Sequence, residues 1–187
     1  MIRWLILFAA CVVLASPAGA AGARLKGLSA LSKELSARIA PEDGPIELDR
    51  FMPADGLDDL VGTWAAFGTE HKFQNGMPNA VNMVLMRLTF SGFAQSLAKS
   101  CASPQLLLND RFFDTLEVLC TWPSQEAKSD AVLTAFWLSL AGYNAPQEEY
   151  QIWREFIIGT YGEKKAPEAI EAMTLALLMN PFVLLEQ

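Results

Sequence analysis

The segment NAVNMVLMRLTFSGFAQSLAKS, residues 79–100, indicates the architecture of this chain. Between Met77 and Gln95 the only charged residue is Arg87. A helix that is apolar on nearly all of its faces usually lies in the middle of a helical protein, covered on every side. The sequence therefore predicts an all-α fold built around a central helix at 79–100.

Further helices are expected on both sides of this segment. Apolar residues recur at intervals of three and four, the spacing of one helical face, and proline, serine and aspartate mark the expected starts. No stretch alternates between apolar and polar residues, as a strand between hairpin turns would. We therefore predict a single-domain bundle of about six to seven helices. The expected ranges are 24–40, 55–67, 79–100, 103–120, 123–142, 146–161 and 166–179.

The apolar positions of these helices are expected to face the core. In the fourth helix, Leu107 and Phe112 are assigned to the inner face, together with Leu116 and Leu119. The terminal segment 181–185 is treated differently, because a chain end is seldom fully enclosed. This segment is our candidate for an apolar surface that a partner covers.

The first twenty residues predict export. Arg3 precedes an uncharged apolar run from Trp4 to Ala15, and a small-residue triplet ends at Ala20. This order of a basic, an apolar and a small-residue region is typical of a secretory signal peptide. A membrane span needs about 20 apolar residues, so an uncleaved anchor is the alternative. The predicted organisation is a signal peptide at 1–20 and a helical domain at 21–187, in the periplasm or outside the cell.

The charge balance narrows the choice of partners. The chain of 187 residues carries a net charge of −7, and removal of Arg3 with the signal peptide makes it −8. Nucleic acid and anionic lipid both attract clustered lysine and arginine. The sequence therefore argues against nucleic-acid binding. It predicts membrane contact only indirectly or through an uncleaved N-terminal segment.

Two cysteines remain after removal of Cys11 with the signal peptide. Exported proteins reach oxidising compartments, where two thiols tend to pair. A bond between Cys101 and Cys120 would close a loop of about 20 residues and add about 3 kcal/mol of stability. We predict this disulfide, and two buried free thiols on neighbouring helices are the alternative.

No catalytic motif is found in the sequence. The single histidine, His71, lies in a polar loop, and no nucleophile elbow of the G-x-S-x-G type is present. Asp110, Asp114 and Glu117 share one helical face, which is more typical of a solvated surface than of a catalytic pair. The sequence thus predicts a protein without catalytic activity, cofactor or metal site. An enzyme whose acids meet only in three dimensions remains an alternative.

The last third of the chain contains three runs with a recognisable sequence pattern. They are Phe136–Tyr143 (FWLSLAGY), Ala145–Tyr150 (APQEEY) and Leu177–Phe182 (LLMNPF). With these runs, residues 131–187 resemble helical modules of secreted, cytochrome-c-associated proteins of the planctomycete type. The haem-attachment motif C-x-x-C-H is absent. The resemblance therefore implies an accessory role beside a redox protein, with no haem of its own.

One polar cluster enters the apolar segment at its start. Asn79 and Asn82 are three residues apart and thus neighbours on a helix, and Arg87 follows. Buried asparagine and arginine must be hydrogen-bonded. These three residues therefore form either a helix cap with a buried structural network or a ligand-binding site at a helix N-terminus.

Two functions follow from these observations. The first is a non-catalytic helical protein of the envelope that associates with another envelope protein as a subunit or accessory factor. The alternative is a periplasmic module that binds a small ligand between helices near Asn79, Asn82 and Arg87.

Overall fold

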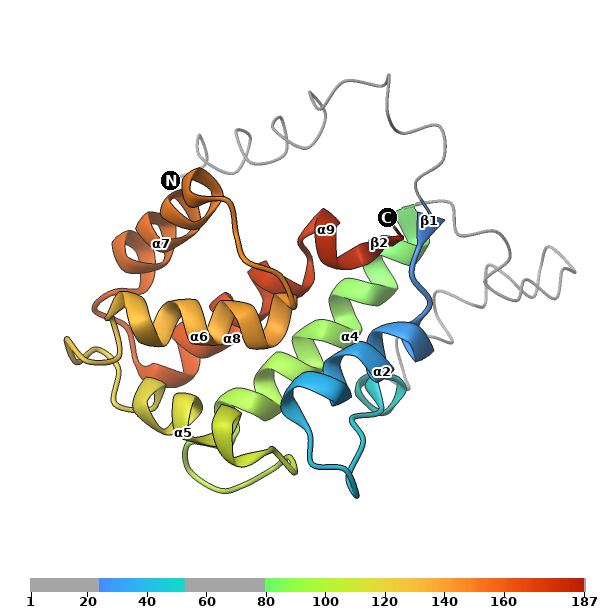
Figure 1. Ribbon diagram of the computed structural model, residues 1–187, viewed down its shortest axis with the longest axis horizontal. Helices are drawn as coiled ribbons and strands as arrows, with labels where there is room; N and C mark the ends of the chain where they lie inside the picture. The colour runs from blue at the N-terminus through green and yellow to red at the C-terminus, as the bar shows by residue number, and fades with distance from the viewer. Residues whose placement is uncertain (1–23, 53–79, 187) are drawn as a thin grey trace, which may run out of the picture.

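The computed structural model describes residues 24–52 and 80–186, and the fold of this part is all-α (Figure 1). Its longest helix, α4, spans Ala80–Lys99, as the apolar pattern predicts. The side chains of Phe90 and Phe93 in this helix are fully buried. Near the start of α4, however, Val84 and Leu88 are exposed, so the expectation that the helix is covered on every side is wrong for this part.

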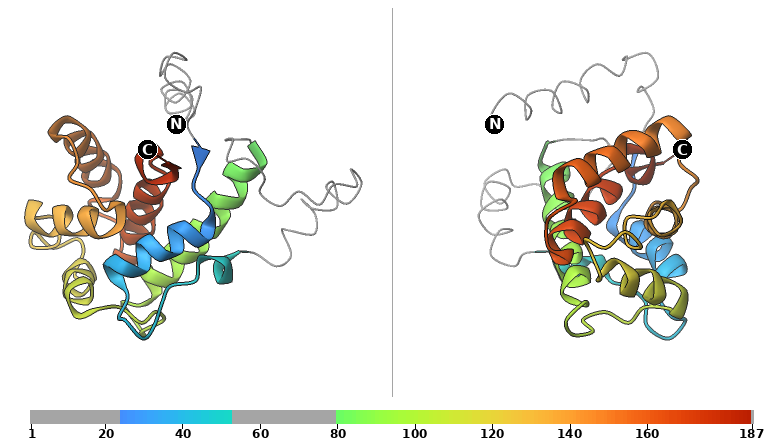
Figure 2. Two further views of the ribbon diagram at one scale, coloured as in Figure 1. Left: turned by 45° about the vertical axis from the view of Figure 1, so that its right-hand side comes forward. Right: turned by 90° about the vertical axis from the view of Figure 1, so that its left-hand side faces the viewer.

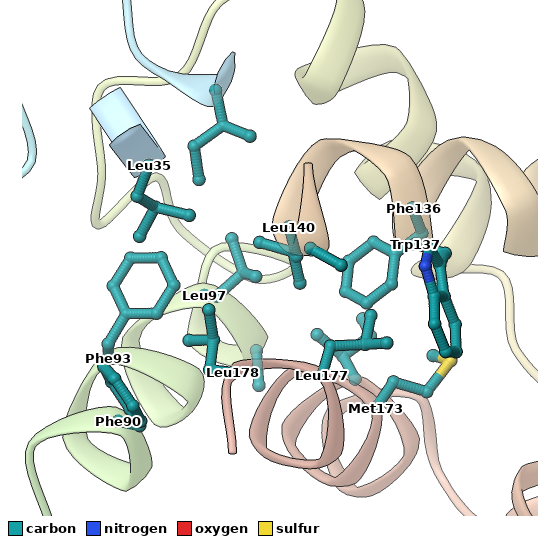
Figure 3. Packing of buried hydrophobic residues seen from close by; sticks show 14 of the residues in the cluster. Leu35, Phe90, Phe93, Leu97, Phe136, Trp137, Leu140, Met173, Leu177 and Leu178 are labelled. Atoms are coloured by element: carbon teal, nitrogen blue, oxygen red, sulfur yellow. The ribbon is translucent and has the colours of Figure 1, made fainter. Parts of the chain in front are cut away.

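Helix α8, Ala166–Leu178, lies between α4 on one side and α6 and α7 on the other (Figure 2). It packs along α4 more extensively than any other described element does. The core in this region is formed by leucine, phenylalanine and methionine side chains from four helices (Figure 3). Its labelled members include Leu35, Phe90, Phe93, Leu97, Phe136, Leu140, Met173, Leu177 and Leu178.

A short segment crosses α4 on its other side. The 3₁₀ helix η1, Leu48–Phe51, contacts α4 at Gly92. A Cβ atom at Gly92 would lie 2.7 Å from the carbonyl oxygen of Phe51. Only glycine therefore lets the two backbones approach this closely without a shift.

Helix α2, Leu28–Ile39, begins later than the predicted 24–40. The residues before it form the short strand β1, Arg24–Leu25, which pairs antiparallel with β2, Leu185–Glu186, at the other end of the chain. Because this pairing holds Arg24 and Leu25 in an extended conformation, the helix begins only after them. As predicted, α2 ends just before Pro41.

The same pairing corrects our expectation for the terminal segment 181–185. Helix α9, Pro181–Leu184, brings Val183 and Leu184 into the core, where each is 2% exposed. Pro181 and Phe182 are exposed, and Phe182 is the large side chain of the two, with 55% of its surface exposed. The broad apolar surface that we expected at the chain end is therefore reduced to one ring.

Helix α5, Asp110–Leu119, starts well after the predicted residue 103. Its N-cap is Asn109, whose Oδ1 accepts a hydrogen bond of 2.9 Å from the backbone N–H of Phe112. The Asn109 side chain also donates to the carbonyl oxygen of Arg38 in α2, so the cap is anchored to a neighbouring helix. Leu107 therefore lies in the preceding loop and is 69% exposed, and its assignment to the inner face is wrong. Phe112, Leu116 and Leu119 are buried as predicted.

Helix α6, Asp130–Ala141, also starts later than predicted. Ser124 caps a turn instead of a helix, since its Oγ accepts from the N–H of Ala127. The N-cap of α6 is Ser129. Its C-terminal residue is followed by Gly142, the predicted end of the helix.

A disulfide joins Cys101, just after α4, to Cys120 at the end of α5. The two Cα atoms are 5.4 Å apart. The predicted pairing of these cysteines is therefore confirmed.

Some predictions fall on residues outside the described ranges. They include the signal peptide at 1–20, the helix at 55–67, His71 and Asn79. Within the described ranges, none of the helices combines the length and apolar character that crossing a bilayer requires.

Candidate functional site

Aromatic side chains gather where α6 faces α7, Gln147–Tyr161. The ring of Trp137 in α6 lies edge-to-face with Trp153, Tyr143 and Tyr150, at centroid distances of 5.2, 5.9 and 6.3 Å. Tyr150 and Trp153 are three residues apart and therefore share one face of α7. Edge-to-face packing is a preferred geometry for aromatic pairs, so this cluster stabilises the α6–α7 contact.

The turn at Gly142 places Tyr143 beside Trp137. Gly142 has a φ of 80°, in the left-handed region that glycine adopts without steric cost, and its N–H donates to the carbonyl oxygen of Leu138. The Arg38 side chain from α2 packs directly against this glycine, and a Cβ atom there would overlap Arg38 Nη1. Burial lowers the pKa of Arg38, and the nearby Glu34 carboxylate partly opposes that effect. The backbone conformation thus requires Gly142, and a larger residue there would also displace the end of the Arg38 side chain.

The aromatic residues line a half-open pocket of about 160 Å³. Its floor is Trp137, which is 2% exposed, and Tyr143 and Tyr150 form half-buried walls. The rim carries exposed polar side chains, and two smaller apolar residues complete the lining. The rim residues are Thr134, Asn144 and Gln147, and the apolar residues are Leu138 and Ala145. A cavity of roughly 150 Å³ holds a molecule of the size of benzene, so the pocket has room for a small group.

Both tyrosine hydroxyls of the pocket donate to carboxylates. The Tyr143 hydroxyl donates to Glu149 Oε1 over 3.0 Å, and Asn180 Nδ2 donates to the same oxygen over 2.6 Å. Burial and the hydrogen bond to Glu149 raise the pKa of Tyr143 above its usual value. Tyr143 is therefore neutral at physiological pH, and its ring stays next to a carboxylate.

Tyr150 is held in a similar way by Asp130. Its hydroxyl donates to Asp130 Oδ1 over 3.1 Å, and burial is the main cause of its raised pKa. Asp130 also forms an ion pair with Arg154, whose Nε lies 2.5 Å from Oδ1. Among the ion pairs of the described residues, none includes Glu149. The carboxylate behind Tyr143 is therefore not neutralised by a described cation.

Two buried N–H donors in this cluster have no acceptor among the described residues. They are the Nε1 atoms of Trp137 and Trp153. Buried polar groups in proteins are almost always hydrogen-bonded, so such a pair is unusual. Both N–H groups belong to the contact between α6 and α7.

Of the predicted ligand residues, Arg87 has a described side chain, and it is not among the residues that line the pocket. Arg87 is exposed on α4, so the expectation that it is buried with a hydrogen-bond network is wrong. Asn82 lies in α4, in a part of the helix for which only the backbone is described, and Asn79 lies outside the described ranges. Sequence reasoning missed the pocket because the helical spacing of Tyr150 does not distinguish a residue that lines a pocket from one in the core. The rich aromatic content of 137–153 was the available signal.

The three acidic residues that share one face of α5 lie at the surface. Asp110, Asp114 and Glu117 are all exposed on α5, as expected for a solvated face. No group of three or more histidine, cysteine or acidic side chains in the described ranges could hold a metal ion. The aromatic pocket is therefore the candidate functional site that the described residues provide.

Comparisons of the chain with protein-family models, with curated proteins and with solved structures found no match. The resemblance of residues 131–187 to modules of cytochrome-c-associated proteins stays a prediction.

Proposed function

We propose that this chain is an exported, non-catalytic helical protein that associates with another envelope protein as a subunit or accessory factor. The observation that carries the proposal is the half-open aromatic pocket between α6 and α7. Tyrosine and tryptophan are enriched at binding interfaces because they combine a large apolar area with a polar tip. The exposed Phe182 ring lies 5.7 Å from Tyr143 and extends this aromatic surface.

Two further features support export. The N-terminal residues have the order of a signal peptide, and the Cys101–Cys120 disulfide suits an oxidising compartment. Sequencing the N-terminus of protein isolated from the envelope tests this part. Export with cleavage predicts a chain that starts at Ala21, and a chain that retains Met1 would contradict it.

The partner is tested by affinity purification from the native envelope in mild detergent, with a tag after Gln187. The wild type is compared with Gln147→Arg at the pocket rim and with Gln105→Arg, an exposed position in the loop before α5. We expect one stoichiometric partner, retained by Gln105→Arg and lost or reduced in Gln147→Arg. Equal retention in both variants would contradict a role for the pocket. Purification of the wild type without a partner would contradict association.

A second candidate function is the binding of a small ligand. The observation that favours it is the size of the pocket, about 160 Å³, with one buried ring as its floor. Small-ligand sites combine mostly apolar walls with a few polar groups, and this pocket has that composition. The site proposed here lies between α6 and α7, and the site near Asn79, Asn82 and Arg87 stays a separate prediction. Monomeric wild-type protein with no partner would favour this second function.

A further inference from the structure

The three rings of the pocket are arranged around a common space. Tyr143 and Tyr150 each lie edge-to-face with Trp137, at interplanar angles of 81° and 71°. All three rings line the same pocket, in which Trp137 is the most buried residue and Tyr143 and Tyr150 are half-buried. Aromatic rings that line one pocket can recognise alkylated ammonium groups by cation–π attraction. A neutral apolar ligand would fill such a space but would gain nothing from the negative ring faces.

The electrostatics of the pocket also favour a cation. The Tyr143 and Tyr150 hydroxyls donate to the carboxylates of Glu149 and Asp130. Each hydrogen bond places negative charge at the edge of a lining ring and increases the electron density that a cation meets. Asp130 is paired with Arg154, whereas no described cation pairs with Glu149. The net charge of −7 also attracts cations to the protein at long range.

The rim does not oppose a positive charge. The polar residues around the opening are Thr134, Asn144 and Gln147, which are neutral. Their side-chain oxygens can accept hydrogen bonds from a polar group that extends out of the pocket. Arg154 belongs to α7 but is not among the lining residues.

From these observations we infer that the pocket between α6 and α7 binds an alkylated ammonium group, held by the rings of Trp137, Tyr143 and Tyr150. The inference rests on the proposed binding role of this pocket. The group belongs either to a free small molecule of the choline type or to a lysine side chain, methylated or unmodified, of a protein partner. Both sources present the same chemistry to the three rings.

The test is a titration of the purified full-length protein, followed by the indole N–H resonances of its tryptophans. Choline is the cationic probe, and its neutral carbon isostere, with a tert-butyl group in place of the trimethylammonium, is the matched control ligand. We expect choline to bind about tenfold more tightly than the isostere, since cation–π attraction is largest at desolvated sites. Equal affinity would overturn the inference about charge and leave pocket binding intact. The absence of any shift with both ligands would overturn pocket binding as well.

Two variants distinguish the contribution of the Tyr150 ring to choline binding from that of its hydroxyl group. Tyr150→Leu removes the ring and is expected to weaken choline binding about tenfold. Tyr150→Phe retains the ring and should restore most of the affinity. Phe113→Leu removes an exposed ring from α5, outside the pocket, and should leave binding unchanged. Equal losses in Tyr150→Leu and Phe113→Leu would contradict the assignment.

The source of the group is decided by a third probe, lysine trimethylated at Nζ and capped at both backbone ends. Tighter binding of this probe than of choline indicates a polypeptide source, and the reverse order indicates a free small molecule. Either order supports the ammonium chemistry. Failure of all cationic probes overturns it, while the envelope partner is tested separately by purification.

Discussion

Replacement of Gly142 by alanine should destabilise the protein, whereas the same replacement at Gly159 should stabilise it. Gly142 has a φ of 80°, and a Cβ atom there would overlap the Arg38 guanidinium. Gly159 lies within α7, and a Cβ atom there would have no neighbour within 4 Å. The two substitutions add the same methyl group. The difference between their effects on stability therefore reports the backbone conformation of Gly142 and its contact with Arg38.

The cost at Gly142 has two parts. An alanine in the left-handed region costs about 1–2 kcal/mol. Displacement of the half-buried Arg38 side chain adds about 1 kcal/mol of lost packing. We therefore expect the free energy of unfolding to fall by about 2–3 kcal/mol. At Gly159, alanine should raise the same free energy by roughly 0.5–1 kcal/mol through higher helix propensity.

The assay is urea unfolding with an unchanged dependence on denaturant concentration as the control for two-state behaviour. A double-mutant cycle with Arg38→Ala directly measures the contribution of Arg38 packing to this cost. In that background, Gly142→Ala should cost only the backbone part, about 1–2 kcal/mol. Equal effects of alanine at Gly142 and Gly159 would refute the reasoning. An unchanged cost of Gly142→Ala in the Arg38→Ala background would refute the packing of Arg38 on the turn.

Three further predictions concern the disulfide, a buried hydroxyl and a half-buried tyrosine. Replacing Cys101 and Cys120 with alanine should lower the free energy of unfolding by about 3 kcal/mol, and reductant should then have no further effect on that variant. Thr174 is fully buried and its Oγ1 has no hydrogen-bond partner among the described residues, so Thr174→Val should stabilise by about 1–2 kcal/mol in thermal or urea unfolding. Because the folded-state pKa of Tyr143 lies above its usual 10.0, the unfolded chain releases this proton first, and stability should fall as the pH rises above about 10. Tyr143→Phe should flatten that decline, and an equally steep decline in the variant would contradict the assignment.

The sequence predicts the helical core well because the apolar residues that become buried recur with the period of a helix. The uncharged run around Phe90 predicts α4 within a residue at each end, and proline predicts the starts of α7 and α8. The predicted starts of α5 and α6 were wrong, because a serine next to a proline can begin a turn as well as a helix. Tertiary hydrogen bonds of Asn109 to α2 decide the first case, and these join residues about 70 apart in sequence.

The pocket was not predictable from periodicity. Tyr150 lies three residues from the buried Trp153 and has the spacing of a core residue, so periodicity does not separate its half-buried ring from a buried one. The approach of Tyr143 to Trp137 depends on the left-handed turn at Gly142 and on Arg38 from a distant helix. The β1–β2 pairing likewise joins the two ends of the described chain, and two-residue strands give no alternation to detect.

The most direct test of the proposed binding role is photo-crosslinking in the intact envelope. A photoreactive phenylalanine derivative is placed at Gln147 on the pocket rim or, as the matched control, at Gln105 in the loop before α5. The account predicts one discrete crosslinked protein from position 147 and none from position 105. The same adducts from both positions, or no adduct from position 147, would contradict it.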